Sequence, residues 1–500
     1  MNAAIGGSAN LPKKERTLPL DSGCKIPCTI GNLFKNISLA VLLNLFVKVA
    51  WIFANNIFQD RVGHEAFGLF LALYSLGFLF LVLADMGIAQ YATVTLAQQP
   101  ELLRRLFPDL LGLKIFLSGI YPFFMVGVGW LLGYESQELY LLFLLCAVQG
   151  ILQVNAFFRA NFQAFQQFGM DAVASVLDRA VMLVIVVVML LTRVTLESYV
   201  WAYLISAVVA MGLMYGAIGR LHGWMLPRLS RMQAGKMLKA SFPFAVITIL
   251  YSLNDKIDQV MLERILGGET GKHETGLYGG AYRWVDTSMM YLWTILPIFF
   301  AKFAKARHRP EELNKLLRFG QPLAALPMIF AAGFVFFHGE KLLFLFQNST
   351  SAELSTMQDT LKILFLAVLV NGICAIYSTL LTSTGHERFV SIMIGVSILL
   401  NVTLNSIFIP QYGAYACAWA TVTSFSFLSL SYIVYIHFKL EAGLPWVPLA
   451  KLCLLTLLYG SAYHFLELSS LPWWLTSTLA GCVLLVLALI LRLIPLRNEH

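Results

Sequence analysis

The sequence has few charged residues. Asp, Glu, Lys and Arg make up 12% of its 500 residues, whereas 58% of the residues are hydrophobic. A soluble domain carries about 25% charged residues, so this shortage excludes a soluble globular protein and predicts an integral membrane protein. The net charge is +8, but in a membrane protein such an excess lies in short loops and sets the orientation. It therefore does not indicate binding to nucleic acid.

The sequence also lacks the signatures of catalysis. It has no P-loop, no paired glycine-rich phosphate loop and no HExxH motif, the patterns that hold nucleotide phosphates or a catalytic zinc ion. Its seven cysteines are scattered, and the pair Cys24 and Cys28 has neither a second pair nor a histidine nearby to support a metal site. We therefore predict a protein that is not an enzyme and that holds no cofactor and no metal.

No signal peptide is predicted, because residues 1–32 lack an apolar core followed by a cleavage site with small residues. This segment is polar and contains Lys13, Lys14, Arg16 and Lys25. We expect it to form a cytoplasmic N-terminal tail.

Long apolar runs are what the sequence has in abundance. A run of about 20 apolar residues crosses a bilayer as an α-helix. An open sheet is excluded because the unpaired backbone groups at its edges would find no hydrogen-bond partner in lipid. We predict an all-α polytopic membrane protein with about fourteen transmembrane helices, at 33–57, 67–89, 109–132, 138–160, 171–192, 197–219, 240–262, 276–300, 317–338, 358–382, 388–409, 412–438, 446–467 and 472–494.

The positive charges predict the orientation of these spans. With a cytoplasmic N-terminus, the inner loops hold Arg104, Arg105, Arg220, Arg228, Arg231, Lys236, Lys239, Lys302, Lys305, Arg307, Arg309, Lys315 and Arg318. The outer side then holds only Arg61, Arg193, Arg264, Lys272 and Lys341. Because cytoplasmic loops carry the excess of Lys and Arg, we expect both termini to face the cytoplasm.

The two halves of the sequence share a short motif. In each half, an acidic residue, an Arg and a nearby Gly follow the end of a predicted span. They occupy 60–63 in the first half and 263–267 in the second. Gly-Leu, with a Tyr six residues after the Gly, then opens the next span at Gly68 and at Gly276. Because the repeats start six spans apart, they share one orientation and are related by an axis along the membrane normal.

The repeat predicts two pseudo-symmetric lobes of six helices each. The predicted units are the tail at 1–32, an N-lobe at 33–220, a cytoplasmic linker at 221–239, a C-lobe at 240–440, and an appended pair of spans with a short C-terminal tail at 441–500.

Two motifs in the first half carry a family resemblance. The stretch Arg61–Phe70 reads RVGHEAFGLF, and Leu83–Ile88 reads LADMGI. Together they resemble the opening of bacterial polysaccharide flippases of the MATE-like superfamily, the Wzx-type exporters of O-antigen and exopolysaccharide. Those proteins show R-x-L-G-x-x-x-F-G-x-Y after the first helix and a D-L-G-L-like end to the second, from which Val62-Gly63 and Ala84-Asp85-Met86-Gly87 depart conservatively. The resemblance extends over residues 33–495 through the span count, the repeat and the orientation.

The resemblance implies both a fold and a function. The fold is two six-helix lobes around a central cavity, with two extra C-terminal helices. The function is to translocate an undecaprenyl-pyrophosphate-linked oligosaccharide, the repeat unit of O-antigen, capsule or exopolysaccharide, across the bacterial cytoplasmic (inner) membrane. The implied partners are this lipid-linked substrate, the bilayer, and a polysaccharide polymerase with other assembly proteins, while coupling to H⁺ or Na⁺ is left open. The alternative is an ion-coupled small-molecule or drug antiporter of the MATE type.

The clearest signal of a polar pathway is a stripe in the predicted span 240–262, formed by Tyr251, Asn254, Asp255, Lys256 and Asp258. A charge at bilayer depth costs about 2.5–3.5 kcal/mol on insertion scales, so such side chains face a water-filled cavity or a partner. They are candidates for contacts with sugar hydroxyls or with a coupling cation. The alternative is a structural network of ion pairs with Arg283 and Asp286 on the next helix.

Cationic candidates for binding pyrophosphate lie in the N-lobe. Asn44, Lys48 and Asn55 share one face of the first predicted span, where Lys48 either binds a phosphate or braces helices by pairing with a carboxylate. Asp178 and Arg179 lie within the fifth predicted span, and Arg159 lies at the cytoplasmic end of the fourth. An arginine can hold a phosphate bidentately. The alternatives are a local pair that braces the fifth span and a positive-inside anchor at Arg159.

Overall fold

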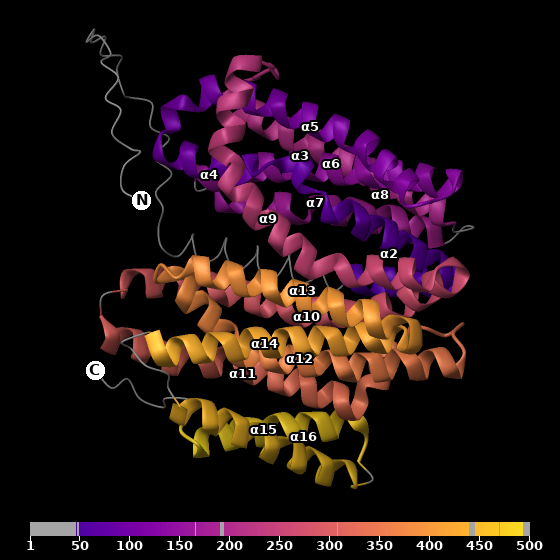
Figure 1. Ribbon diagram of the computed structural model, residues 1–500, viewed down its shortest axis with the longest axis vertical. Coiled ribbons are helices and arrows are strands. Elements are labelled where there is room, and N and C mark those ends of the chain that lie inside the picture. The colour runs from indigo at the N-terminus through magenta and orange to yellow at the C-terminus, as the bar shows by residue number, and fades with distance from the viewer. Residues whose placement is uncertain are drawn as a thin grey trace.

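The structure of the protein, a computed structural model, describes residues 47, 50–165, 167–190, 195–307, 309–439, 446–469 and 471–493. Within these ranges every regular element is a helix, and no strand occurs. The predicted all-α class is therefore confirmed. Figure 1 shows two stacked bodies of helices and a smaller pair beyond them.

The first body, which we call the N-terminal body, holds the helices before residue 223 (Figure 1). It comprises the helical residues 50–62, α2 (His64–Leu79), α3 (Val82–Asp85), α4 (Ile88–Gln98), the 3₁₀ helix η1 (Pro100–Leu102), α5 (Leu103–Leu131), α6 (Ser136–Ala164), α7 (Phe168–Leu190) and α8 (Leu196–His222).

The second body, the C-terminal body, follows the long helix α9 (Arg231–Leu266). It comprises α10 (Gly268–Lys305), α11 (Pro310–His338), the 3₁₀ helix η2 (Gly339–Leu343), α12 (Ser351–Ser383), α13 (Glu387–Tyr412) and α14 (Ala414–Lys439). The last pair, α15 (Trp446–Glu467) and α16 (Trp473–Ile490), lies on the side of this body away from the N-terminal body (Figure 1).

Eleven described helices are long and apolar enough to cross a membrane, and the bent run from His64 to Thr93 makes up to twelve. Two of the fourteen predicted spans are not in this number. The first, 33–57, lies largely outside the described residues, and the seventh corresponds to α9, whose charged and amide side chains lower its hydropathy. A polytopic membrane protein is confirmed, while the number fourteen stays a prediction.

Each body has its own apolar core, and α9 belongs to both. Val260 packs in the cluster that contains Phe58 and Tyr199 of the N-terminal body. Leu262, two residues later, packs with Tyr278 in the C-terminal body. Residues two apart point about 200° apart around a helix, so α9 lies between the two bodies and contacts both. The predicted boundaries of the two lobes and the linker stay a prediction.

The two ends of the bodies differ in charge. We call the end at His64, where α2 and α10 begin, the seam end, and the end where α9 begins at Arg231 the basic end. The positive-inside rule predicts that the seam end faces outward and the basic end faces the cytoplasm.

Equivalent helices begin with the same signal at the seam end. Both α6 and α12 start with a capping box, formed by Glu135 with Glu138 and by Thr350 with Glu353. In this motif the side chains of the first and fourth residues each accept a hydrogen bond from the other's backbone N–H. The boxes thus place Glu138 and Glu353 at the same turn of their helices.

The second span is interrupted and braced. It bends by 50° after Leu79, and Met86 and Gly87 then adopt left-handed backbone conformations with φ of 48° and 74°. Asp85 accepts a hydrogen bond from the Gly87 N–H at 3.2 Å and forms an ion pair with Lys114 of α5, and both charged side chains are buried. A buried ion pair therefore stabilises the span where its own backbone hydrogen bonds are interrupted.

Candidate functional site: an inter-body cavity and a polar seam

A cavity of about 910 Å³ lies against the C-terminal body and is bounded on the other side by Phe78 and Gln90 of the N-terminal body. It is lined along α10 from Tyr282 to Phe300 and along α12 from Asn371 to Thr382. Because both helices run from the seam end to the basic end, the cavity extends toward the basic end. Its volume is in the range of small-molecule sites.

The lining of the cavity is apolar with scattered neutral polar groups. The lining side chains with an amide or an aliphatic hydroxyl are Gln90, Ser252, Asn371, Ser378, Thr379, Thr382 and Ser429. Among the described lining residues, Asp286 carries the charge, and Lys256 Nζ lies 3.7 Å from its carboxylate. Amide and hydroxyl groups of this kind suit a neutral polyhydroxyl ligand better than an anion.

The polar stripe of α9 is divided between different surroundings. Lys256 reaches Asp286 and lies 5.5 Å from the centre of the Tyr282 ring, at the edge of the cavity. Asp258 points elsewhere, into the C-terminal body. The side chains of Tyr251 and Asp255 lie outside the described residues.

Asp258 is buried among neutral hydrogen-bond donors. Its carboxylate accepts from Asn405 Nδ2 at 2.7 Å, from Thr421 Oγ1 at 2.8 Å and from the Tyr278 hydroxyl at 3.1 Å. Asn405 also donates to Asn401 Oδ1 at 3.0 Å, and its own buried Oδ1 has no hydrogen-bond partner within the described part of the chain. Three helices, α10, α13 and α14, thus each direct one neutral hydrogen-bond donor at the same carboxylate.

Arg283 lies at the boundary between the two bodies, and its hydrogen-bond partners among the described residues do not include Asp258. Its guanidinium donates to Asn56 Oδ1 at 2.5 Å and to Gln59 Oε1, and it stacks on the Phe67 ring at 4.7 Å. It therefore links α10 of the C-terminal body to the N-terminal body rather than pairing with Asp258.

The candidates of the first predicted span are only partly described. Asn44 and Lys48 lie outside the described residues. Asn55 is buried, and its Oδ1 accepts a hydrogen bond from the Tyr199 hydroxyl at 2.6 Å. This contact packs the segment 50–62 against α8.

The other predicted cations lie in the N-terminal body. Arg159 of α6 pairs with Asp171 of α7 at 2.8 Å. Asp178 and Arg179 follow on α7, where both are partly buried. None of these lines the cavity described above.

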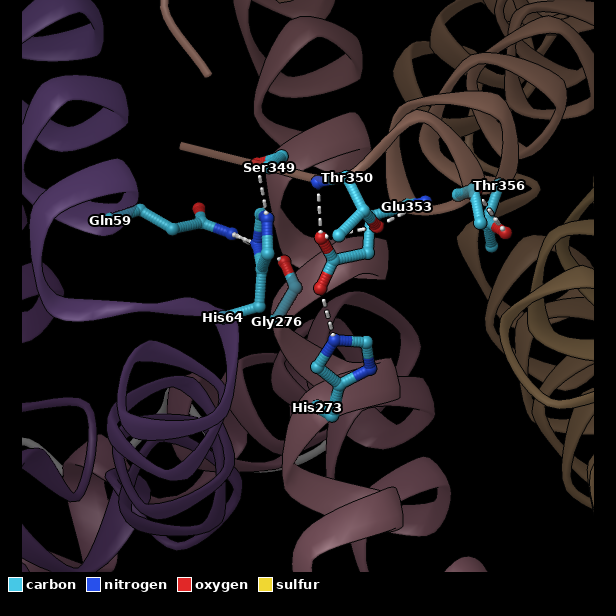
Figure 2. A network of polar contacts seen from close by, with 9 residues as sticks. Gln59, His64, His273, Gly276, Ser349, Thr350, Glu353 and Thr356 are labelled. Atoms are coloured by element: carbon cyan, nitrogen blue, oxygen red, sulfur yellow. Dashed lines mark hydrogen bonds and ion pairs between the residues drawn. The ribbon is translucent and has the colours of Figure 1, made fainter. Parts of the chain in front are cut away.

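The sequence prediction missed a polar seam that joins the two bodies at the seam end. Gln59 Nε2 donates to the Gly276 carbonyl at 2.8 Å, and His64 Nε2 lies 2.7 Å from Ser349 Oγ (Figure 2). Nearby, the Asn348 N–H donates to Asp60 at 2.8 Å. We define the seam as Gln59, Asp60, His64 and Glu138 of the N-terminal body with Lys272, Gly276, Arg283, Asn348 and Ser349 of the C-terminal body.

Glycines of the internal repeat bring α2 and α10 together at the seam. A Cβ added to Gly68 would collide with the Lys272 carbonyl, and one added to Gly276 would collide with the His64 carbonyl. Each glycine faces the backbone four residues before the other, so the contact has two-fold symmetry. The repeated glycines were visible in the sequence, but their contact was not.

A neighbouring contact holds α9 to the N-terminal body. Arg264 lies 3.4 Å over the Tyr134 ring, and the Tyr134 hydroxyl donates to Glu263 at 2.8 Å. Burial raises the pKa of Tyr134, which keeps this phenol protonated and able to donate.

Solved structures share this architecture. A structure described as "Lipid II flippase MurJ, inward closed conformation" has 16% identity and a TM-score of 0.72, over 91% of this chain and 99% of that chain. An inward-facing multidrug resistance MATE family transporter has 15% identity and a TM-score of 0.64, over 78% and 93%. A MOP superfamily transporter from Pyrococcus furiosus has 16% identity and a TM-score of 0.58, over 80% and 93%. At these identities the likeness shows the fold.

Family models match the sequence itself. No curated protein matches it, but the model described as MatE matches residues 243–407. The model described as "Polysaccharide biosynthesis protein" matches residues 33–301, more than half of the chain. The chain therefore belongs to the polysaccharide biosynthesis protein family, with the fold of the MOP superfamily of membrane transporters.

Proposed function

We propose that this protein flips a lipid-linked oligosaccharide, an undecaprenyl-pyrophosphate-linked repeat unit of O-antigen, capsule or exopolysaccharide, from the inner to the outer leaflet of the bacterial cytoplasmic membrane. The observation that carries the proposal is an inter-body cavity, whose apolar lining carries scattered hydroxyl and amide groups, in a chain of the polysaccharide biosynthesis family whose two bodies are joined by a polar seam.

Alternating access would move the head group. The two bodies rock about the cavity, which extends toward the basic end while the seam joins the bodies at the other end. The sugar lies in the cavity, and the polyprenyl tail stays in the bilayer through a lateral gap. Keeping the tail in lipid avoids a cost of about 0.8 kcal/mol for each CH₂ exposed to water.

The pyrophosphate would bind the N-terminal body. The charged group in the described lining of the cavity is Asp286, which already pairs with Lys256, so we assign the pyrophosphate to Lys48, Arg159 and Arg179. Both termini face the cytoplasm in this proposal, and the polymerase and other assembly proteins receive the substrate on the outer side.

A cation gradient would supply the energy through Asp258. The carboxylate lacks a cationic partner among the groups that hydrogen-bond to it. Carboxylate and carbonyl oxygens are the ligands of hard cations, and a carboxylate can equally take up a proton.

The test is to locate the substrate. In cells that lack the gene, lipid-linked sugars should accumulate on the cytoplasmic leaflet, where a membrane-impermeant oxidant reaches them in sealed inside-out vesicles but not in right-side-out vesicles. Restoring the protein should move them to the outer leaflet. Unchanged surface polymer in the deleted strain would contradict the proposal.

Charge reversal tests the assigned cations. Lys48→Glu combined with Arg179→Glu should abolish export while the protein stays inserted in the membrane. The matched control is Lys341→Glu, an exposed lysine at the seam end, which should export normally. Full export by the double variant would refute the assignment of these cations.

The second candidate is an ion-coupled small-molecule antiporter. The match of residues 243–407 to the MatE model, which includes Asp258, favours it. In that case neutralising Asp258 would raise drug sensitivity, and deletion would leave the surface glycan normal.

A further inference from the structure

The seam contains two arms that are related by the internal repeat. His64 and Lys272 each lie four residues before the glycine at which α2 and α10 touch. Lys272 forms an ion pair with Glu138 at the start of α6 at 2.8 Å, whereas His64 reaches Ser349, just before α12. One arm carries a permanent charge, and the other carries an imidazole, which takes up a proton between about pH 5 and 8.

The hydrogen bonds of Gln59 fix the position of the proton on His64 (Figure 2). Gln59 Oε1 accepts from Arg283, which has only donors, so the other end of the amide is the NH₂ group. That NH₂ donates to the Gly276 carbonyl at 2.8 Å and directs its second hydrogen at His64 Nδ1, also at 2.8 Å. His64 Nδ1 therefore accepts, and the proton of the neutral imidazole is on Nε2, donated to Ser349 Oγ.

We propose that His64 is a proton-binding site that opens the seam. A proton on Nδ1 would oppose the Gln59 NH₂, donor against donor, at hydrogen-bond distance. It would also place a second positive charge beside Arg283 in a buried site. This cost arises in the closed seam alone, so proton uptake shifts the equilibrium toward the open one.

The neighbouring charged groups do not remove this cost. Those that face His64 are Asp60 from the preceding helical segment, His273 and Arg283 from α10, and Glu353 from α12. Glu353 already accepts from His273 at 2.7 Å and from the Thr350 N–H at 2.6 Å (Figure 2). Asp60 accepts from Asn348. Both carboxylates are thus engaged in other contacts, and Gln59 rather than either of them faces Nδ1.

This inference goes beyond the proposed function, because it names what opens the seam and holds for any transported substrate. It also uses the predicted orientation, in which the seam faces outward and senses the pH outside the cell. The readout is a distance within the protein, so its outcome is independent of the substrate assignment.

The experiment measures the opening of the seam. Spin labels on Gln137→Cys and Ala352→Cys, exposed residues at the starts of α6 and α12, report the distance between the bodies in full-length protein whose native cysteines are replaced. From pH 8 to pH 5.5 the ratio of open to closed populations should rise about tenfold, as expected when one histidine binds its proton only in the open form. In His64→Gln the change should be less than about twofold.

Two matched variants separate His64 from its neighbours. His273→Gln and Lys272→Gln should keep the acid response, because neither alters the bond between Gln59 and His64. An acid response that persists in His64→Gln, or that is lost in His273→Gln, would overturn the proposal.

If the seam of His64→Gln is open at every pH, a further variant, Gln59→Glu, still tests the mechanism. Gln59→Glu supplies a carboxylate acceptor to Nδ1, so protonated His64 fits the closed seam and acid should no longer open it. Retention of the tenfold acid response in Gln59→Glu would refute the mechanism.

Discussion

The Asp258 carboxylate differs from those of Asp85 and Asp286 in the kind of partner it has. Lys114 meets Asp85 and Lys256 meets Asp286, whereas the hydrogen bonds to the Asp258 carboxylate come from an amide and two hydroxyls. An ion pair braces helices, but a carboxylate whose partners are neutral can take up a cation or a proton.

We predict that Asp258→Asn uncouples transport from the ion gradient. The amide removes the charge that would attract a cation, and the ratio of transport with and without an imposed H⁺ or Na⁺ gradient should fall to about one, because no coupling free energy remains. Proteoliposomes with defined gradients measure this ratio. Asp359→Asn, which removes an exposed carboxylate of α12, is the control and should keep the wild-type ratio. Equal stimulation by the gradient in both variants would exclude Asp258 as the coupling site.

Lys114 is expected to be structural. Lys114→Met leaves Asp85 buried without its cation beside the break in the second span, and stranding one partner of a buried pair costs about 3–5 kcal/mol. The thermal midpoint of detergent-solubilised protein, followed by size-exclusion chromatography, should fall clearly. Lys341→Met, at an exposed pair with Glu340, should change the stability by less than about 1 kcal/mol. If both variants melt alike, the pair does not brace the span.

At the scale of elements, the approach of α2 and α10 depends on two glycines. We predict that Gly276→Ala weakens the closed seam, because its Cβ would collide with the His64 carbonyl, which is backbone and cannot turn away. The spin-label distance across the seam should shift toward the open population at neutral pH. Gly395→Ala, in a helix where the new Cβ meets nothing within 4 Å, should leave the distance unchanged. An unchanged distance in both variants would show that the helices separate without this contact.

The helices themselves were largely predictable from the sequence, because a run of apolar residues long enough to cross lipid has few other solutions. The exceptions follow from the same physics. α9 carries the polar stripe that made it the clearest functional signal, and this stripe also keeps it out of the set that composition alone identifies as spans. The bend after Leu79 and the left-handed Met86 lie close in sequence to Asp85, whose ion pair with Lys114 joins two helices and cannot be read from sequence spacing.

The site was less predictable, because sequence spacing gives the face of a helix but not its neighbour. One of the two alternatives for Asp255 and Asp258 was an ion-pair network with Arg283. In the structure Asp258 faces α13 and α14, and Arg283 faces Asn56 and Gln59. Pairings between residues about 150 to 230 positions apart depend on how the bodies pack. His64 gave no signal, because a histidine beside a glycine at a helix start looks like an ordinary turn.

At the scale of the whole molecule, alternating access requires that the contacts at the seam break in every cycle. Asp60 and Asn348 join the two bodies there by a hydrogen bond of 2.8 Å, so cysteines at both positions, in protein without its native cysteines, can be joined by a short thiol cross-linker. We predict that cross-linking Asp60→Cys with Asn348→Cys stops transport into proteoliposomes and that a cleavable linker, once reduced, restores it. The control pair, Glu340→Cys with Gln358→Cys, joins two residues of the C-terminal body whose side chains lie 3.3 Å apart, so transport should continue when it is linked. Full transport with the seam linked would mean that the two bodies need not separate at this end, and the rocking mechanism would then be wrong even if the substrate is right.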